Sequence, residues 1–224
     1  MKLSVIMPVF NEKNTVKKAV ERVLRQPFVH QLVIVNDGST DGSKKIINSI
    51  KSKKVVTVNN NKNLGKGSAV RQGLLKVTGD YIIINDADLE YDPKDIKELI
   101  IPIKEKKAKV VYGSRFKGPH TNMFFWHYVG NNFLNLLVNV LFNTTLSDME
   151  TCYKLVPTDL IKSFKLTAND FGFEPEVTCK ILKTKHRIYE VPISYSGRGY
   201  DEGKKLHWTQ GIRAVQIILK ERFL

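Results

Sequence analysis

The chain has 224 residues, of which 42% are hydrophobic and 26% charged, so it is long enough for one substantial core and is not composed like a disordered chain. Its formal net charge of +14 suits nucleic acid, an anionic membrane surface or a phosphorylated substrate as partner, although a solvated lysine-rich surface explains it equally well. The two cysteines, Cys152 and Cys179, form no C-x-x-C pair, so we expect neither a zinc site nor a disulfide framework.

Five apolar runs predict the strands of a sheet: residues 3–9, 32–35, 55–58, 81–84 and 110–112. The segments between them, residues 12–26, 41–50, 66–77 and 93–106, are expected to be helices, with Asn11 and Asp41 as N-caps of the first two. Strands that are apolar on both faces and alternate with helices predict a single α/β domain. Its sheet should be Rossmann-like, mostly parallel and covered by helices on both faces.

The second half of the chain is less regular. Residues 123–142 predict a helix in which Asn132, Asn135, Asn139 and Asn143 form one polar stripe. We favour burial of this helix against the sheet, and a position in a membrane interface is the alternative. A strand at 188–195, a mobile glycine-rich loop at 197–205 and a basic amphipathic helix at 208–222 complete the prediction.

No segment is expected to cross a membrane, because the most apolar one, residues 123–142, contains a histidine and several asparagines. Asn11 and Glu12 interrupt the first apolar run, so we do not expect a signal peptide. The sequence therefore predicts a cytoplasmic protein that visits a membrane surface or is held there by a separate integral membrane partner.

Polar clusters follow the predicted strands, where ligands bind in parallel sheets. After the fourth strand, alternation along an extended segment would place Asp86 and Asp88 on one side, with Glu90 continuing the pattern. Carboxylates at this position suit Mg²⁺ or Mn²⁺, which would neutralise a departing diphosphate. The D-x-D spacing often occurs by chance. The metal prediction therefore depends on the position of this motif directly after an apolar strand.

Other polar residues have two readings each. Asp37, after the second strand, can accept hydrogen bonds from a ribose or a base, but Asn36-Asp37-Gly38-Ser39 is also turn chemistry, which we favour. Lys66 lies in a glycine-rich stretch that matches no phosphate-binding motif, so it either helps to hold a nucleotide or follows a simple turn into a helix.

Three basic residues are candidates for phosphate contacts: Arg115 after the fifth strand, and Arg198 and Lys204 in the glycine-rich loop. An exposed charged loop is the alternative for the last two. Asp148 and Glu150 precede an apolar run, and either can act as a general base, while Asp148 can equally cap a turn.

Together these residues resemble the inverting family 2 glycosyltransferases of the GT-A fold, over nearly the whole chain. Within that family the resemblance is to the polyprenyl-phosphate glycosyltransferases, which include dolichyl-phosphate mannose synthase. The segments that carry it are residues 5–12, 35–41, 63–67, 86–88, 113–116, 148–154, 171–174 and 191–205.

The resemblance implies metal-dependent transfer of a hexose, mannose or glucose, from a GDP- or UDP-sugar to a polyprenyl phosphate at a membrane surface. Residues 1–115 would bind the donor and residues 116–224 the acceptor, with Asp148 and Arg115 as catalytic residues. It also implies a set of residues around the nucleotide sugar: Pro8, Phe10, Glu12, Val35, Asp37, Lys66, Ala87, Arg198 and Lys204. The metal would lie at Asp86, Asp88 and Glu90.

Three other functions remain open from the sequence. The acceptor can be a sugar hydroxyl in polysaccharide or glycolipid synthesis, in which case a base such as Asp148 becomes necessary. The chain can be a nucleotidyltransferase, which also needs carboxylates and a metal. It can also be a non-catalytic nucleotide or nucleic-acid binding module, but no basic-aromatic stripe or nucleic-acid motif is present, so no nucleic acid is expected.

Overall fold

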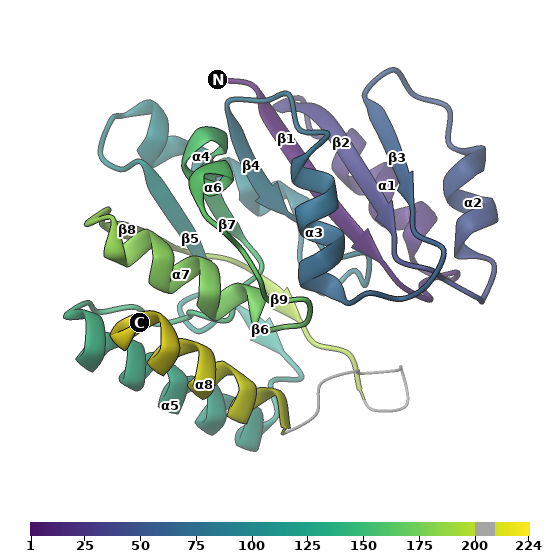
Figure 1. Cartoon of the computed structure of the whole chain (residues 1–224). Helices are drawn as coiled ribbons and strands as arrows, with labels where there is room; N and C mark the ends of the chain where they lie inside the picture. The colour runs from purple at the N-terminus through teal and green to yellow at the C-terminus, as the bar shows by residue number, and fades with distance from the viewer. Residues whose placement is uncertain (200–208) are drawn as a thin grey trace.

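The computed structural model describes residues 1–199 and 209–224. A seven-stranded sheet with the order β3-β2-β1-β4-β7-β5-β8 forms its centre (Figure 1). These strands are β1 (Leu3–Val9), β2 (Val29–Asn36), β3 (Val55–Asn59), β4 (Tyr81–Ile84), β5 (Val110–Ser114), β7 (Lys154–Pro157) and β8 (Ile188–Pro192). All neighbours are parallel except those of β7, which is antiparallel to β4 and β5.

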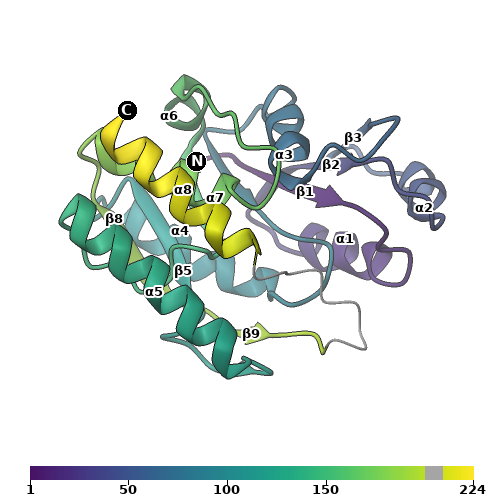
Figure 2. The ribbon, with the colours of Figure 1, turned by 60° about the horizontal axis from the view of Figure 1, so that its bottom comes forward.

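Helices cover both faces of the sheet, with α1 and α3 on opposite sides in both views (Figures 1 and 2). The helices are α1 (Val16–Leu24), α2 (Ser43–Ser49), α3 (Lys66–Leu74), the 3-10 turn η1 (Pro93–Asp95), α4 (Ile96–Lys104), α5 (Phe125–Phe142), α6 (Thr158–Ser163), α7 (Phe173–Lys183) and α8 (Thr209–Phe223). A small sheet pairs β6 (His120–Thr121) with β9 (Tyr195–Ser196).

The predicted α/β sheet is confirmed, and its core follows from the apolar runs. All residues of β1 except Pro8 are buried, and α1 buries Val16, Ala19, Val20 and Val23, which lie at helical spacing. Because β1, β2 and β4 run parallel, their carboxyl ends meet at one edge, where the polar segments 10–12, 37–39 and 85–90 gather.

The beginning of α1 differs from the prediction. The helix begins at Val16 with Thr15 as N-cap, and Asn11 lies earlier in a turn, with a positive φ of 54°. The side-chain oxygen of Asn11 accepts a hydrogen bond from Thr40 N at 2.8 Å. Asn11 therefore ties the loop after β1 to the loop after β2, which asparagine can do because it tolerates this conformation.

Helices α5 and α8 lie side by side beside α7 and form a second, smaller core (Figures 1 and 2). Only part of the predicted asparagine stripe of α5 faces the protein: Asn135 bonds Ser147 O and Met149 N, and Asn139 bonds Leu146. Asn132 instead bonds Tyr128 O of its own helix, and Asn143 is exposed. The helix packs mainly against α7 and α8, whereas the sequence had led us to expect burial against the sheet. The opposite face of α5 is apolar and exposed. Within the described residues, no helix is long and apolar enough to cross a membrane.

Candidate active site

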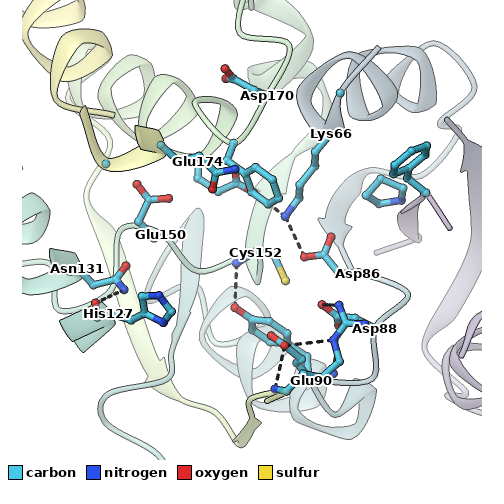
Figure 3. Close-up of a pocket in the computed structure, with 18 of the residues that line it drawn as sticks. Lys66, Asp86, Asp88, Glu90, His127, Asn131, Glu150, Cys152, Asp170 and Glu174 are labelled. Carbon is cyan, nitrogen blue, oxygen red and sulfur yellow. Dashed lines mark hydrogen bonds and ion pairs between the residues drawn. The ribbon is translucent and has the colours of Figure 1, made fainter. Parts of the chain in front are cut away.

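A pocket of about 950 Å³ opens at the carboxyl ends of the central strands and extends to α5 and α8. This is the upper range of volumes that hold small-molecule ligands. Figure 3 shows Asp86, Asp88 and Glu90 on one side of it and Glu150 and Glu174 on another. The acidic residues that the sequence predicts after β4 are therefore brought together with groups from far along the chain.

The acidic segment after β4 is a turn, not the extended segment that the sequence suggested. Residues 87 and 88 form the turn, and Leu89 has a positive φ of 68°. The turn gathers the carboxylates of Asp86, Asp88 and Glu90 at the pocket, so the predicted convergence has a different cause from strand alternation.

The carboxylates of this turn repel one another in a buried place. Burial and the charges of Asp86 and Glu90 raise the pKa of Asp88 to about 7, against the opposing effect of Arg198. The turn thus holds more negative charge than its surroundings neutralise, which favours the arrival of a cation.

Lys66 at the start of α3 bridges two of the pocket's carboxylates. Its Nζ lies 2.8 Å from Asp86 Oδ2 and 2.8 Å from Glu174 Oε1. Burial disfavours its charge, but Asp86 and Glu174 outweigh burial and raise its pKa well above the ordinary value. Gly65, the residue before it, has a φ of 93°, and a Cβ there would lie 2.3 Å from Asn169 O, so glycine is needed to bring α3 this close.

Arg198 is the second cation of the acidic turn. Its guanidinium lies 3.3 Å from Glu12, 3.5 Å from Asp88 and 3.4 Å from Glu90. Arg198 N also donates to Glu90 Oε1, while Tyr195 OH donates to Glu90 Oε2 at 2.7 Å. Lys204, the other predicted phosphate contact in this loop, lies outside the described residues.

Most of the predicted nucleoside contacts, but not all of them, lie at the pocket. Five of the residues predicted to surround the nucleotide sugar line the pocket: Pro8, Phe10, Glu12, Asp37 and Ala87. The side chain of Val35 does not reach it, because Val35 is fully buried in the core.

The carboxylate of Asp37 also anchors a loop. It accepts hydrogen bonds from Asn60 Nδ2 and from the backbone N–H groups of Leu64 and Gly65, at 2.8–3.1 Å. The predicted turn at residues 36–39 is present separately: Gly38 has a φ of 69°, and Ser39 N donates to Asn36 Oδ1 at 3.2 Å. Asp37 thus belongs to a turn, anchors a distant loop and also lines the pocket.

Arg115 lines the pocket and is held from behind by Asp148. The Asp148 carboxylate is fully buried and accepts three hydrogen bonds from Arg115, from N, Nε and Nη2, at 2.7–2.9 Å. Asp148 itself is not part of the pocket wall. The ion pair holds the Arg115 guanidinium in a fixed position at the pocket. The Asp148 carboxylate, which the sequence predicted as a candidate general base, is therefore occupied by Arg115.

Sequence reasoning gave no site role to several residues that line the pocket. Glu174 comes from α7, which contributes a buried helix beside the sheet that periodicity did not reveal. Trp126 and Phe133 of α5 and Ile212 of α8 form an apolar part of the wall. The motif at 171–174 was visible in the sequence, but only long-range packing brings it to the acidic turn.

Asp86 and Asp88 fit a divalent metal chemically, because they are hard oxygen ligands that attract two protein cations, Lys66 and Arg198. Glu90 is already engaged by Tyr195 and Arg198, so it fits a water-mediated contact better than a direct one. Among the residues that the structure describes, no three acidic, histidine or cysteine side chains already converge as a complete metal site. A bound diphosphate would supply the remaining oxygens.

The mostly parallel sheet, with the acidic D-x-D turn and the pocket at the carboxyl ends of its strands, has the GT-A fold. Residues 4–164 match the family described as Glycosyl transferase family 2, so the chain belongs to this family.

Two curated relatives and one solved structure illustrate the similarity. The low-salt glycan biosynthesis hexosyltransferase Agl6 of Haloferax volcanii is 28% identical over 97% of this chain and 53% of its own length. The dodecaprenyl-phosphate galacturonate synthase of Rhizobium johnstonii is 26% identical over 91% of this chain and 62% of its own. This chain therefore spans between about half and two thirds of these relatives.

A crystal structure of Mycobacterium tuberculosis glucosyl-3-phosphoglycerate synthase with Mn²⁺, UDP and glucosyl-3-phosphoglycerate has the same fold. Its TM-score is 0.77 at 16% identity, covering 99% of this chain and 80% of the other.

Proposed function

We propose that the protein transfers a hexose from a GDP- or UDP-sugar to a polyprenyl phosphate at the cytoplasmic face of a membrane, with Mg²⁺ or Mn²⁺ at Asp86 and Asp88. Residues 1–115 would bind most of the donor, and residues 116–224 most of the acceptor. The names of the relatives support this acceptor class, because one of them is a dodecaprenyl-phosphate galacturonate synthase. The bound Mn²⁺ and UDP of the glucosyl-3-phosphoglycerate synthase support a metal and a nucleotide donor.

The observation that carries the proposal is the continuity of the pocket from charged to apolar walls. The wall includes the charged residues Asp86, Asp88 and Arg115, which follow β4 and β5, and the apolar residues Trp126, Phe133 and Ile212 of α5 and α8. A polyprenyl phosphate has the same division, since its phosphate needs cations and its chain needs apolar surface. A sugar acceptor with many hydroxyls would not need the apolar end.

The donor's nucleoside would lie against Pro8 and Phe10 at the end of β1, beside the end of the neighbouring β2. Its diphosphate would reach Asp88, where Arg198 is already placed to contact it. A bound divalent metal would neutralise charge on the leaving diphosphate. Lys66 would hold Asp86 in place, because its Nζ contacts both Asp86 and Glu174.

The transfer would be one displacement at the anomeric carbon. An oxygen of the acceptor phosphate forms a bond to this carbon as the bond to the diphosphate oxygen breaks, from the opposite face, so the configuration inverts. The nucleoside diphosphate leaves with the bonding electrons. The second pKa of a phosphate monoester is about 6, so the nucleophile is already mostly anionic at neutral pH and needs no base. Arg115 would hold this phosphate.

The exposed apolar face of α5 supports contact with a membrane surface. Its large exposed side chains are Phe125, Trp126, Tyr128, Val129, Phe133, Leu136 and Val140, and we call them the α5 apolar face. Ile212, Leu219 and Phe223 of the adjacent α8 are exposed as well. Because aromatic and aliphatic side chains favour the boundary of a bilayer, this face would bring the apolar end of the pocket to the lipid. The net charge of +14 favours an anionic surface.

The test is a panel of GDP- and UDP-sugars with Mn²⁺ or Mg²⁺, each with and without a short polyprenyl phosphate. We expect one donor to release its nucleoside diphosphate in a metal-dependent reaction that the lipid phosphate stimulates, with a sugar-phosphate-lipid product of inverted configuration. Release stimulated only by a sugar alcohol would overturn the acceptor. Release of pyrophosphate instead would identify a nucleotidyltransferase.

A further inference from the structure

Two carboxylates of the pocket, Glu150 and Glu174, have no assigned contact with donor or acceptor in the mechanism above. Glu174 is 2% exposed, and its Oε2 has no hydrogen-bond partner among the described residues. The same holds for Oε1 of Glu150 within this part of the chain. Both residues line the pocket, and Figure 3 shows Glu150 between Glu174 and the α5 residues His127 and Asn131.

Buried carboxylates elsewhere on α7 are treated differently. Glu176, two residues after Glu174, is equally buried, and its oxygens accept hydrogen bonds from Thr167 N, Thr167 Oγ1 and Ala168 N. Within the described part of the chain, the carboxylate of Glu174 has only the ion pair of its Oε1 with Lys66. A buried acceptor without a hydrogen bond destabilises a fold. Carboxylate oxygens that face a pocket and have no partner therefore indicate a ligand that donates hydrogen bonds to them.

The position of the pair indicates which part of the ligand this is. The proposed function places the nucleoside at the ends of β1 and β2. In the sheet, β4, which leads to Asp86, lies next to β1, and β7 lies beyond β4. Glu150 precedes β7, and Glu174 is separated from Asp86 only by the ammonium group of Lys66, at 2.8 Å from each. A ligand with its nucleoside at Phe10 and its diphosphate at Asp86 and Asp88 therefore places its next group, the sugar, against Glu150 and Glu174.

We propose that Glu150 and Glu174 are the residues that select the donor sugar: their open oxygens accept hydrogen bonds from its hydroxyl groups, and their charge rejects a sugar that carries a carboxylate. This inference rests on the proposed function. An ionised carboxylate only accepts hydrogen bonds, so hydroxyl groups are its natural partners. A hexuronate would bring a third negative charge into the same buried space, whereas a neutral hexose brings only donors.

The test measures binding at pH 8, where Glu150 is mostly ionised because burial raises its pKa only to about 7. Calorimetry with Mn²⁺ compares UDP, UDP-glucose and UDP-glucuronate, or GDP, GDP-mannose and GDP-mannuronate if GDP binds better. The variants are Glu150→Gln and Glu174→Gln, with Glu176→Gln as the matched buried control. Affinity for the free diphosphate reports the nucleotide site, and the ratio of nucleotide-sugar to free-diphosphate affinity reports the sugar.

We expect Glu150→Gln to lower the hexose ratio and raise the hexuronate ratio by about tenfold each, as for one charge-assisted hydrogen bond. Glu174→Gln should act in the same direction, and Glu176→Gln should change neither ratio. Thermal unfolding of each variant separates loss of fold from loss of selection, and Glu150→Gln, which breaks no ion pair seen in the structure, keeps the test available if Glu174→Gln does not fold.

Unchanged ratios in a folded Glu150→Gln variant would overturn the proposal. A loss of kcat with unchanged ratios would also overturn it, because that result identifies Glu150 as a general base. If wild-type protein binds no nucleoside diphosphate, the proposed function itself fails, and this outcome is distinct from both.

Discussion

The carboxylate of Asp148 holds the guanidinium of Arg115 at two points, with Nε at 2.8 Å from Oδ2 and Nη2 at 2.7 Å from Oδ1. A third hydrogen bond, from Arg115 N to Oδ2, ties the same carboxylate to the backbone after β5. Arg115 faces the pocket while Asp148 is fully buried behind it. In this geometry Asp148 therefore positions Arg115. This role and the general-base role predicted from the sequence can be distinguished by experiment.

Asp148→Asn should impair both fold and transfer without removing a titrating base. We expect the free energy of unfolding to fall by about 3 kcal/mol, because one partner of a buried ion pair loses its charge. We expect kcat/KM to fall while the acidic limb of its pH profile stays in place. Loss of that limb would instead identify Asp148 as the general base. Asp80→Asn, which removes an exposed carboxylate, serves as the control and should change neither quantity.

The stability of the protein without donor should depend on pH through Glu150. Burial and the charge of Glu174 raise the pKa of Glu150 to about 7, from an ordinary value of 4.5, against the opposing charge of Lys154. Between these values the folded state holds a proton that the unfolded chain has lost. The resulting stability is present below about pH 4.5 and is lost as the pH rises through about 7.

Glu150→Gln removes this titration. At pH 8 we expect the variant to be more stable than the wild type by about 2 kcal/mol, and at pH 5 the difference should shrink. Urea unfolding at four pH values measures it, with the exposed Glu105→Gln as control. A difference that is constant from pH 5 to pH 8 would contradict the shifted pKa.

Arg198 and a divalent metal should compete for the acidic turn. Arg198 lies within 3.5 Å of Asp88 and Glu90, so its removal leaves these carboxylates with less neutralisation. We expect Arg198→Ala to bind Mn²⁺ more tightly without nucleotide, by about tenfold. The same variant should bind the nucleoside diphosphate more weakly once Mn²⁺ is present, because Arg198 no longer contacts its phosphates.

Electron paramagnetic resonance of free Mn²⁺ measures the first affinity, and calorimetry the second. Arg22→Ala is the matched control, since it breaks an ion pair with Asp92 at 3.3 Å outside the pocket. Weaker Mn²⁺ binding by Arg198→Ala in the absence of nucleotide would contradict the competition.

The sheet was readable from the sequence because its parallel strands are short, apolar and separated by turn residues. The four residues of β4 were predicted with their observed bounds, as were the seven of β1. The polar residues after these strands could be placed at one edge for the same reason, so the sequence alone predicts that Asp86, Asp88 and Glu12 lie close together.

What could not be read depends on contacts between distant segments. Strand β7 is four residues long and antiparallel to its neighbours, so the alternation of strands and helices that predicts the parallel strands does not apply to it. Helix α7 buries residues on most of its surface, including Glu174 and Glu176, and therefore lacks an amphipathic pattern. Val35 was assigned to the nucleoside by resemblance, but its side chain points into the core. The partners of Asp148 and Glu174 likewise exist only in the folded chain.

The α5 apolar face provides the last prediction. Phe125 and Leu136 are 67% and 61% exposed, do not line the pocket, and lie on the same side of the helix because eleven residues make about three turns. If this side enters a membrane interface, each residue contributes by burying apolar area there. Replacing them with serine should therefore weaken membrane binding and leave nucleotide binding unchanged.

We expect the wild type to sediment with vesicles that contain anionic lipid at low salt, and less so at high salt. Phe125→Ser and Leu136→Ser should each reduce the partition coefficient by about tenfold, as for about 1.4 kcal/mol of lost burial. Leu75→Ser is the control, because Leu75 is an apolar residue at the end of α3 that is 80% exposed, more than either Phe125 or Leu136. Equal effects of all three substitutions would show that the α5 apolar face has no special role in membrane binding. If salt weakens binding but none of the substitutions does, the protein binds the membrane through charge alone.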